Sequence, residues 1–182
     1  MPDLATSPSA ARAGRATGAM FFAFFGAAWL ILGALRSGHA SFLFFAVVLL
    51  IAASIFFLAL RHYGVNRSAR EAVAETPASR RRSRWFNIIN ALQWFAIFLV
   101  SNILANLHHG EWIIPAIILI VGLHFFPLAR LFCYPPHYIT GAVLVLIAAG
   151  YPFLAPGGPA SPAGSFATGL VLWVSALYGL ST

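Results

Sequence analysis

The sequence predicts an all-α membrane protein, a six-helix transmembrane bundle with both termini in the cytoplasm. The 182 residues are 60% hydrophobic and only 8% charged, which is far more apolar than a soluble domain. Six apolar stretches make up most of the chain, and about 20 such residues suffice to cross the ~30 Å hydrocarbon layer. None of the four carboxylates and no lysine falls inside these stretches.

The elements follow in a simple order. Residues 1–17 are rich in alanine, serine and proline, carry two arginines, and are predicted to be a disordered basic tail. Residues 18–182 then form a single domain. Its spans are expected at 19–35, 41–60, 86–107, 112–129, 138–154 and 165–180. A secretory signal peptide cleaved near residue 40 is the alternative for the first span, but the second span begins at once, as in a helical hairpin.

Arginine residues predict the orientation. All eleven cations are arginine, and seven of them lie in the one long polar connection, 61–85, which is predicted to be a solvated cytoplasmic loop. With a cytoplasmic N-terminus, ten arginines lie inside and only Arg36 lies outside. This asymmetry follows the rule that cytoplasmic loops carry the positive charge.

Four of these arginines, Arg80, Arg81, Arg82 and Arg84, directly precede the third span. Beside an anionic leaflet each basic residue contributes about 1 kcal/mol of attraction, so lipid head groups are candidate ligands. The favoured interpretation is that these arginines only fix the topology. No base-reading module accompanies them, so nucleic-acid binding is not expected.

The third span is the most polar of the six. At about 100° per residue its amides and hydroxyls gather on one side of a helix, and they are Asn87, Asn90, Gln93, Ser101, Asn102 and Asn106. Such a face could line a hydrated cavity or bind a ligand. The favoured alternative is that the amides bond to neighbouring helices, each bond contributing about 0.6 kcal/mol.

The fourth span contains a Gly-x-His-x-x-Pro pattern formed by Gly122, His124 and Pro127. Pro127 has no amide hydrogen and frees the carbonyl of Leu123, so a helix kink is expected beside the only histidine well inside a span. His124 could relay a proton or contact a ligand there, and Arg130 could hold an anionic group. The favoured alternative is that His124 bonds to the amides of the third span and fixes packing.

This pattern, with the aromatic-rich turn that follows it as far as Tyr138, resembles one in uncharacterised bacterial multi-pass membrane proteins classed as a domain of unknown function. The resemblance covers a short part of the chain. It implies a bacterial cytoplasmic membrane and a special role for His124 and Pro127, and it implies no activity.

Several membrane activities lack the residues that they require. A retinal Schiff base needs a lysine, haem needs paired deep histidines, a metal needs clustered ligands, and intramembrane proteolysis needs an aspartate or a Gly-x-Ser-x-Gly elbow. The sequence therefore predicts no enzyme, no cofactor and no metal.

The expected function is a scaffold or partner-binding subunit that contacts lipid and either a second copy of the chain or another membrane protein. The alternative is a small-solute transporter or channel, whose polar path would be lined by Asn90, Gln93, Asn102 and His124.

Small residues recur along the first and last spans. In the first, Gly26 lies among alanines spaced four apart, and in the last, Ser165 is followed by Gly169. Such spacing lets helix backbones approach closely. Internal packing is expected at these positions rather than self-association.

Overall fold

The computed structural model describes residues 7–38, 40–74 and 76–182. Its long helices are α1 (Pro8–Ser37), α2 (Phe42–Ala74), α3 (Pro77–Asn106), α4 (Ile113–Phe132), α5 (Pro136–Leu154) and α6 (Ala163–Ser181). Two short 3-10 helices, η2 (Gly110–Trp112) and η3 (Gly158–Ala160), lie in the connections. All six long helices of the described residues are long and apolar enough to cross a membrane, which confirms the predicted all-α, six-helix fold.

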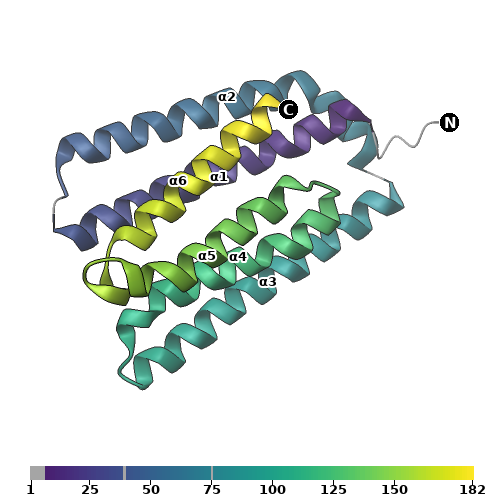
Figure 1. The fold of residues 1–182 in the computed structure, drawn as a ribbon. Coiled ribbons are helices and arrows are strands. Elements are labelled where there is room, and N and C mark those ends of the chain that lie inside the picture. The colour runs from purple at the N-terminus through teal and green to yellow at the C-terminus, as the bar shows by residue number, and fades with distance from the viewer. Residues whose placement is uncertain (1–6, 39, 75) are drawn as a thin grey trace.

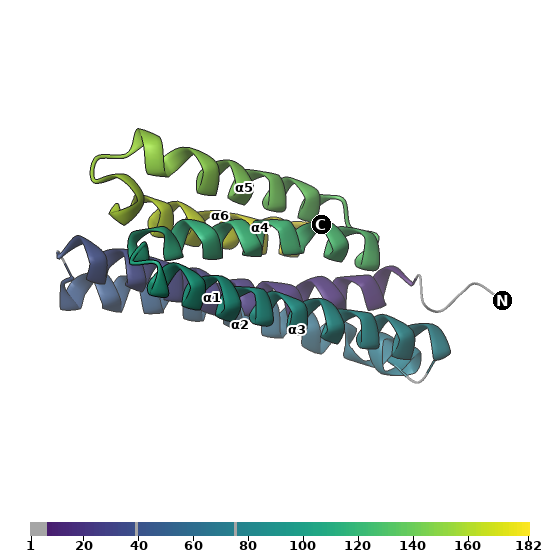
Figure 2. The same ribbon diagram turned by 90° about the horizontal axis from the view of Figure 1, so that it is seen from below.

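The helices run side by side in two groups of three (Figure 1). α1 packs against α2 and α6, and α4 packs against α3 and α5. Contacts of α6 with α5, and fewer with α4, join the two groups. α2 and α3 therefore lie at opposite edges of the bundle in Figure 1, and the view from below places α5 on the side away from α1, α2 and α3 (Figure 2).

The prediction of a disordered tail was wrong for residues 8–17, which form the first turns of α1. The side chain of Ser7 caps this helix, since its Oγ accepts a hydrogen bond from the Ala10 amide at 3.1 Å. Pro8 occupies the first helical turn, where its missing N–H leaves no bond unmade. Residues 1–6 and His39 lie outside the described residues.

The predicted loop at 61–85 was wrong as well, because α2 continues to Ala74 and α3 already begins at Pro77. No proline interrupts the chain between 61 and 74, and an ion pair of 2.6 Å joins Arg67 to Glu71 one turn later. Composition predicted a polar segment correctly, but polarity does not by itself end a helix.

As a result, most of the arginines lie on helices that extend past the membrane. α1, α2 and α3 have 30, 33 and 30 residues, and at about 1.5 Å per residue each exceeds the ~30 Å hydrocarbon layer. The extensions of these three helices lie together at one end of the bundle, which we call the arginine-rich end. It consists of the first turns of α1 and α3, the last turns of α2, and the turn between α4 and α5. α6 also ends here (Figure 1).

Two glycine pairs bring helices into close contact. α1 crosses α6 at Gly26 and Gly169, where a Cβ on Gly169 would lie 2.8 Å from the carbonyl oxygen of Gly26. α4 crosses α5 at Gly122 and Gly141, where a Cβ on Gly141 would lie 2.8 Å from the carbonyl oxygen of Gly122. Internal packing is thus confirmed for the small residues at the α1–α6 crossing.

Apolar side chains around these crossings form two clusters. One lies between α1, α2 and α6 and includes Leu30, Ile55 and Trp173. The other lies between α4, α5 and α6 and includes Ile118 and Leu172. The buried indole Nε1 of Trp173 donates a hydrogen bond of 3.1 Å to the Ala23 carbonyl across the first cluster, so its polar group is satisfied.

Candidate functional site

Three of the polar residues predicted to form a site, Asn90, Gln93 and Asn102, lie on α3. This helix has no buried residue. Asn90 and Gln93 are half-buried, while Asn102 is exposed. α3 packs mainly on α4, and its half-buried positions recur every three or four residues along that face. Asn102 therefore points away from the rest of the chain.

Asn90, Asn102 and Asn106 bond to carbonyls of their own helix. The Nδ2 groups of Asn90 and Asn102 donate to the carbonyls of Phe86 and Phe98, at 2.9 and 2.7 Å. These bonds use one of the two N–H groups of each amide. Within the described part of the chain, no hydrogen bond joins either amide to His124.

His124 lies instead among aromatic rings at the interface of α4 and α5. It is half-buried, its Nδ1 is buried without a hydrogen-bond partner, and its ring meets that of Phe125 edge-on at 5.7 Å. His137, in the first turn of α5, is near enough to interact with it electrostatically. The Phe125 ring touches both, since its centre is 5.5 Å from that of His137.

Two further residues complete this group at the arginine-rich end. The ring of Tyr134 packs edge-on against the ring of His137, with 4.9 Å between their centres. The guanidinium of Arg15 lies over the Tyr134 ring, 5.9 Å from its centre. Such a cation–π contact is worth about 0.5–2 kcal/mol. We call the five residues Arg15, His124, Phe125, Tyr134 and His137 the histidine cluster.

The histidine cluster contains most of the buried side-chain polar atoms that lack a hydrogen-bond partner in the described residues. Of the four buried side-chain nitrogen and oxygen atoms without a partner among the described residues, three belong to Arg15, His124 and Tyr134, and the fourth to Ser165. Of the histidine cluster, the sequence predicted only His124 as a site residue. It did not predict Arg15 and Tyr134, because these two residues lie more than a hundred positions apart in the chain. Only the packing of α1 on the α4–α5 turn brings them together.

A testable consequence concerns the unpaired Nδ1 of His124. We expect His124→Leu to leave the free energy of unfolding unchanged or to raise it by about 1 kcal/mol, because the substitution removes a buried nitrogen that has no partner. Thr140→Val is the control: its Oγ1 lies 2.9 Å from Ser175 Oγ and 3.2 Å from the Pro136 carbonyl, so this variant should lose stability. Thermal unfolding in detergent measures both. A large loss of stability in His124→Leu would show that His124 holds the fold together.

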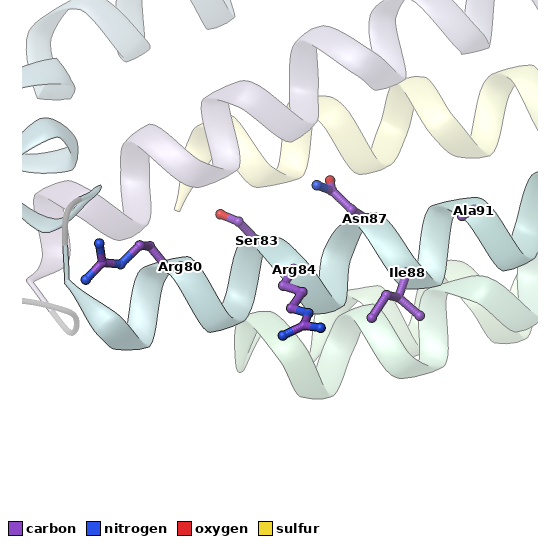
Figure 3. A pocket seen from close by; sticks show the side chains of 6 residues that line it. All are labelled: Arg80, Ser83, Arg84, Asn87, Ile88 and Ala91. Carbon is purple, nitrogen blue, oxygen red and sulfur yellow. The ribbon is translucent and has the colours of Figure 1, made fainter.

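Four of the remaining predicted residues lie on two shallow surfaces beside α3, and Arg81 and Arg82 belong to neither of them. Pro127 and Arg130 line a groove of about 320 Å³ between α3 and α4, together with Trp85, Ile89 and Leu131. Pro127 is exposed and lies inside α4, which continues as helix to Phe132. Arg80 and Arg84 lie on an open surface at the start of α3, together with Ser83, Asn87, Ile88 and Ala91 of the same helix (Figure 3).

The structure thus separates the predicted ligand set. Arg130 lies in the groove between α3 and α4, His124 belongs to the histidine cluster, and Asn102 is exposed on the outer side of α3. Among the described residues, no three histidine, cysteine or acidic side chains lie together as metal ligands would.

No family model, curated protein or solved structure matches this sequence. The function must therefore be inferred from the residues of the chain itself. The resemblance carried by Gly122, His124 and Pro127 stays a prediction.

Proposed function

We propose that the chain is a non-enzymatic scaffold subunit of the membrane, and that α3 binds the α3 helix of a second copy. The observation that supports this most is the exposure of α3, a helix of 30 residues of which none is buried. Lipid can cover an apolar helix face, but α3 also carries amides within its apolar part. Polar groups that face hydrocarbon are costly unless a partner satisfies them.

An exposed stripe on α3 has the spacing of a helix–helix seam. Its members follow each other at intervals of four and three residues, and all are exposed: Ala91, Phe95, Phe98, Asn102 and Ala105. Phe95 and Phe98 expose 62% and 68% of their surface. Two large rings between small alanines give a surface into which a second helix can pack closely.

Asn102 is the reason for choosing a second copy as the partner. One N–H of its amide already bonds to the Phe98 carbonyl, which leaves one donor and the acceptor oxygen free for a partner. An amide is complementary to itself, because it both donates and accepts. Two copies inserted in the same orientation run their α3 helices parallel, so a two-fold axis places Asn102 opposite its own copy.

Disulfide trapping in native membranes tests the contact. Cys133, the one cysteine of the sequence, is first replaced by serine, and Phe98→Cys is compared with Leu146→Cys on α5. The two positions are matched, since 68% and 70% of their side chains are exposed. We expect oxidation to yield a covalent dimer for Phe98→Cys and monomer for Leu146→Cys.

A second substitution separates pairing from folding. Asn102→Leu, added to Phe98→Cys, should lower the dimer yield about three- to twentyfold and leave monomer stability unchanged, because one intramembrane amide pair contributes about 0.6–1.7 kcal/mol. Equal crosslinking at Phe98 and Leu146 would contradict the proposal. A crosslinked product of another mass would show that a different protein, and not a second copy, lies on α3.

A further inference from the structure

The first turns of α1 and the last turns of α2 continue beyond the apolar part of the bundle. They comprise residues 8–17 and 61–74, which we call the α1–α2 extension. α4, α5 and α6 have only 20, 19 and 19 residues and stop earlier. Figure 2 accordingly shows the end of α2 and the start of α3 reaching past the ends of these three helices.

The α1–α2 extension is a packed part of the fold. Ala13 and Ala16 are 0% exposed, although both precede the apolar part of α1. The side chain of Arg70 reaches from α2 to α1, since its Nη1 lies 3.4 Å from the position that a Cβ on Gly14 would take. The rule that sets topology counts positive charges near a span and requires no such packing. Topology alone therefore does not account for an ordered extension.

Three arginines belong to the same part of the extension. Arg12 and Arg15 flank Gly14 on α1, and Arg70 lies against it from α2. In the described residues neither of the two ion pairs involves any of these arginines. The whole chain has four carboxylates against eleven arginines, so most of its positive charge has no counter-charge in the protein. Like charges repel, and an anionic partner beside them relieves the repulsion.

The height of these cations above the membrane favours a soluble partner over lipid. Arg70 follows Leu60, the last residue of the second apolar span, by ten positions, or about 15 Å of helix. Arg12 precedes Ala19, the first residue of the first span, by about 10 Å. The head-group layer adds only about 5–8 Å to each side of the hydrocarbon. Both arginines therefore lie in water, where the attraction of an anionic leaflet falls off within about 8 Å.

We propose that the α1–α2 extension binds an acidic segment of a soluble protein. Arg12 and Arg70 are exposed and bind its carboxylates, while Arg15 stays over the ring of Tyr134. Single-stranded nucleic acid fits less well, because the only rings of the extension, those of His62 and Tyr63, lie at the membrane edge and leave no surface for base stacking further out. The inference is independent of the proposed pairing of two α3 helices.

Binding of a defined acidic peptide tests the proposal. The full chain is placed in nanodiscs of phosphatidylcholine, which carry no net charge, and is titrated against a labelled 16-residue polyglutamate by fluorescence anisotropy. We expect saturable binding that is tighter than that of a 16-residue oligothymidylate. Absence of peptide binding would overturn the proposal. Tighter binding of the oligothymidylate would also overturn it, and would identify nucleic acid as the partner.

Two double variants separate a docking site from net charge. Arg12→Gln with Arg70→Gln should weaken peptide binding about tenfold, which is 1.4 kcal/mol shared by two exposed ion pairs. Arg81→Gln with Arg82→Gln removes the same charge from the start of α3 and should change the affinity less than threefold. Equal losses in the two variants would contradict the proposal, since the attraction would then depend only on total charge.

A spin label on α2 tests whether the extension stands in water. Cys133 is first replaced by serine, and Ser68→Cys in the extension is compared with Leu50→Cys in the apolar part, both of which are exposed positions. We expect the label at position 68 to collide mainly with a water-soluble nickel complex and the label at position 50 mainly with oxygen. A label at position 68 that collided mainly with oxygen would place the extension in the bilayer, which would assign its arginines to lipid and overturn the proposal.

Discussion

We expect Gly26→Ala to lower the free energy of unfolding by about 2–3 kcal/mol, although alanine is the better helix former by about 1 kcal/mol. A Cβ at this position would lie 2.3 Å from Cδ1 and 2.5 Å from Nε1 of Trp173. The indole cannot turn away freely, since it is buried and its Nε1 bonds to the Ala23 carbonyl. Relief would require α6 to move away from α1.

Thermal unfolding in detergent, followed by circular dichroism, measures the effect. Gly18→Ala is the matched control, because Gly18 lies two turns earlier on α1 and a Cβ there would meet nothing within 4 Å. Gly18→Ala should raise the melting temperature slightly through helix propensity alone. If the melting temperatures of both variants shifted in the same direction, the α1–α6 crossing would not be as close as described.

The second large effect is expected at the crossing of α4 and α5. Gly141→Ala would place a Cβ 2.8 Å from the carbonyl oxygen of Gly122 and 3.0 Å from Cβ of Phe125. Because a backbone atom is the obstacle, no change of rotamer relieves the contact and the two helices must separate. We expect a loss of about 2–3 kcal/mol, and Phe125 would shift against His124 and His137.

Gly150→Ala on the same helix provides the comparison. Its Cβ would lie 3.7 Å from Cδ1 of Leu154, an ordinary van der Waals distance, so this variant should be at least as stable as the parent protein. The same unfolding measurement applies. A Gly141→Ala protein that unfolds at the temperature of Gly150→Ala would contradict the close packing of α4 on α5.

The separation of the predicted polar residues bears on the choice between scaffold and transporter. A transport path would need Asn90, Gln93, Asn102 and His124 around one hydrated passage. Asn102 instead lies on the exposed side of α3, and the polar residue near His124 is His137. This arrangement supports the proposed scaffold, and disulfide trapping at Phe98 is the measurement that tests it.

Part of the candidate site could be predicted from the sequence. The helical period placed Asn87, Asn90 and Asn102 near one side of α3, and the count of arginines before the third span marked Arg80 and Arg84. The period could not say which side of α3 meets α4. It therefore could not predict that Asn102 stays exposed.

By itself the sequence determined the six spans, because apolar length and the lack of charge are local properties of each segment. An apolar segment long enough to cross the bilayer must form a helix, since its backbone groups find no water to bond with. It did not determine where the helices end, since arginine and alanine continue a helix into water as readily as they form a loop. Tertiary structure alone decided that Arg15 covers Tyr134 and that Gly26 meets Trp173. Contacts between distant segments depend on which helix faces pack together, and that choice is made by the fit of side chains across the bundle.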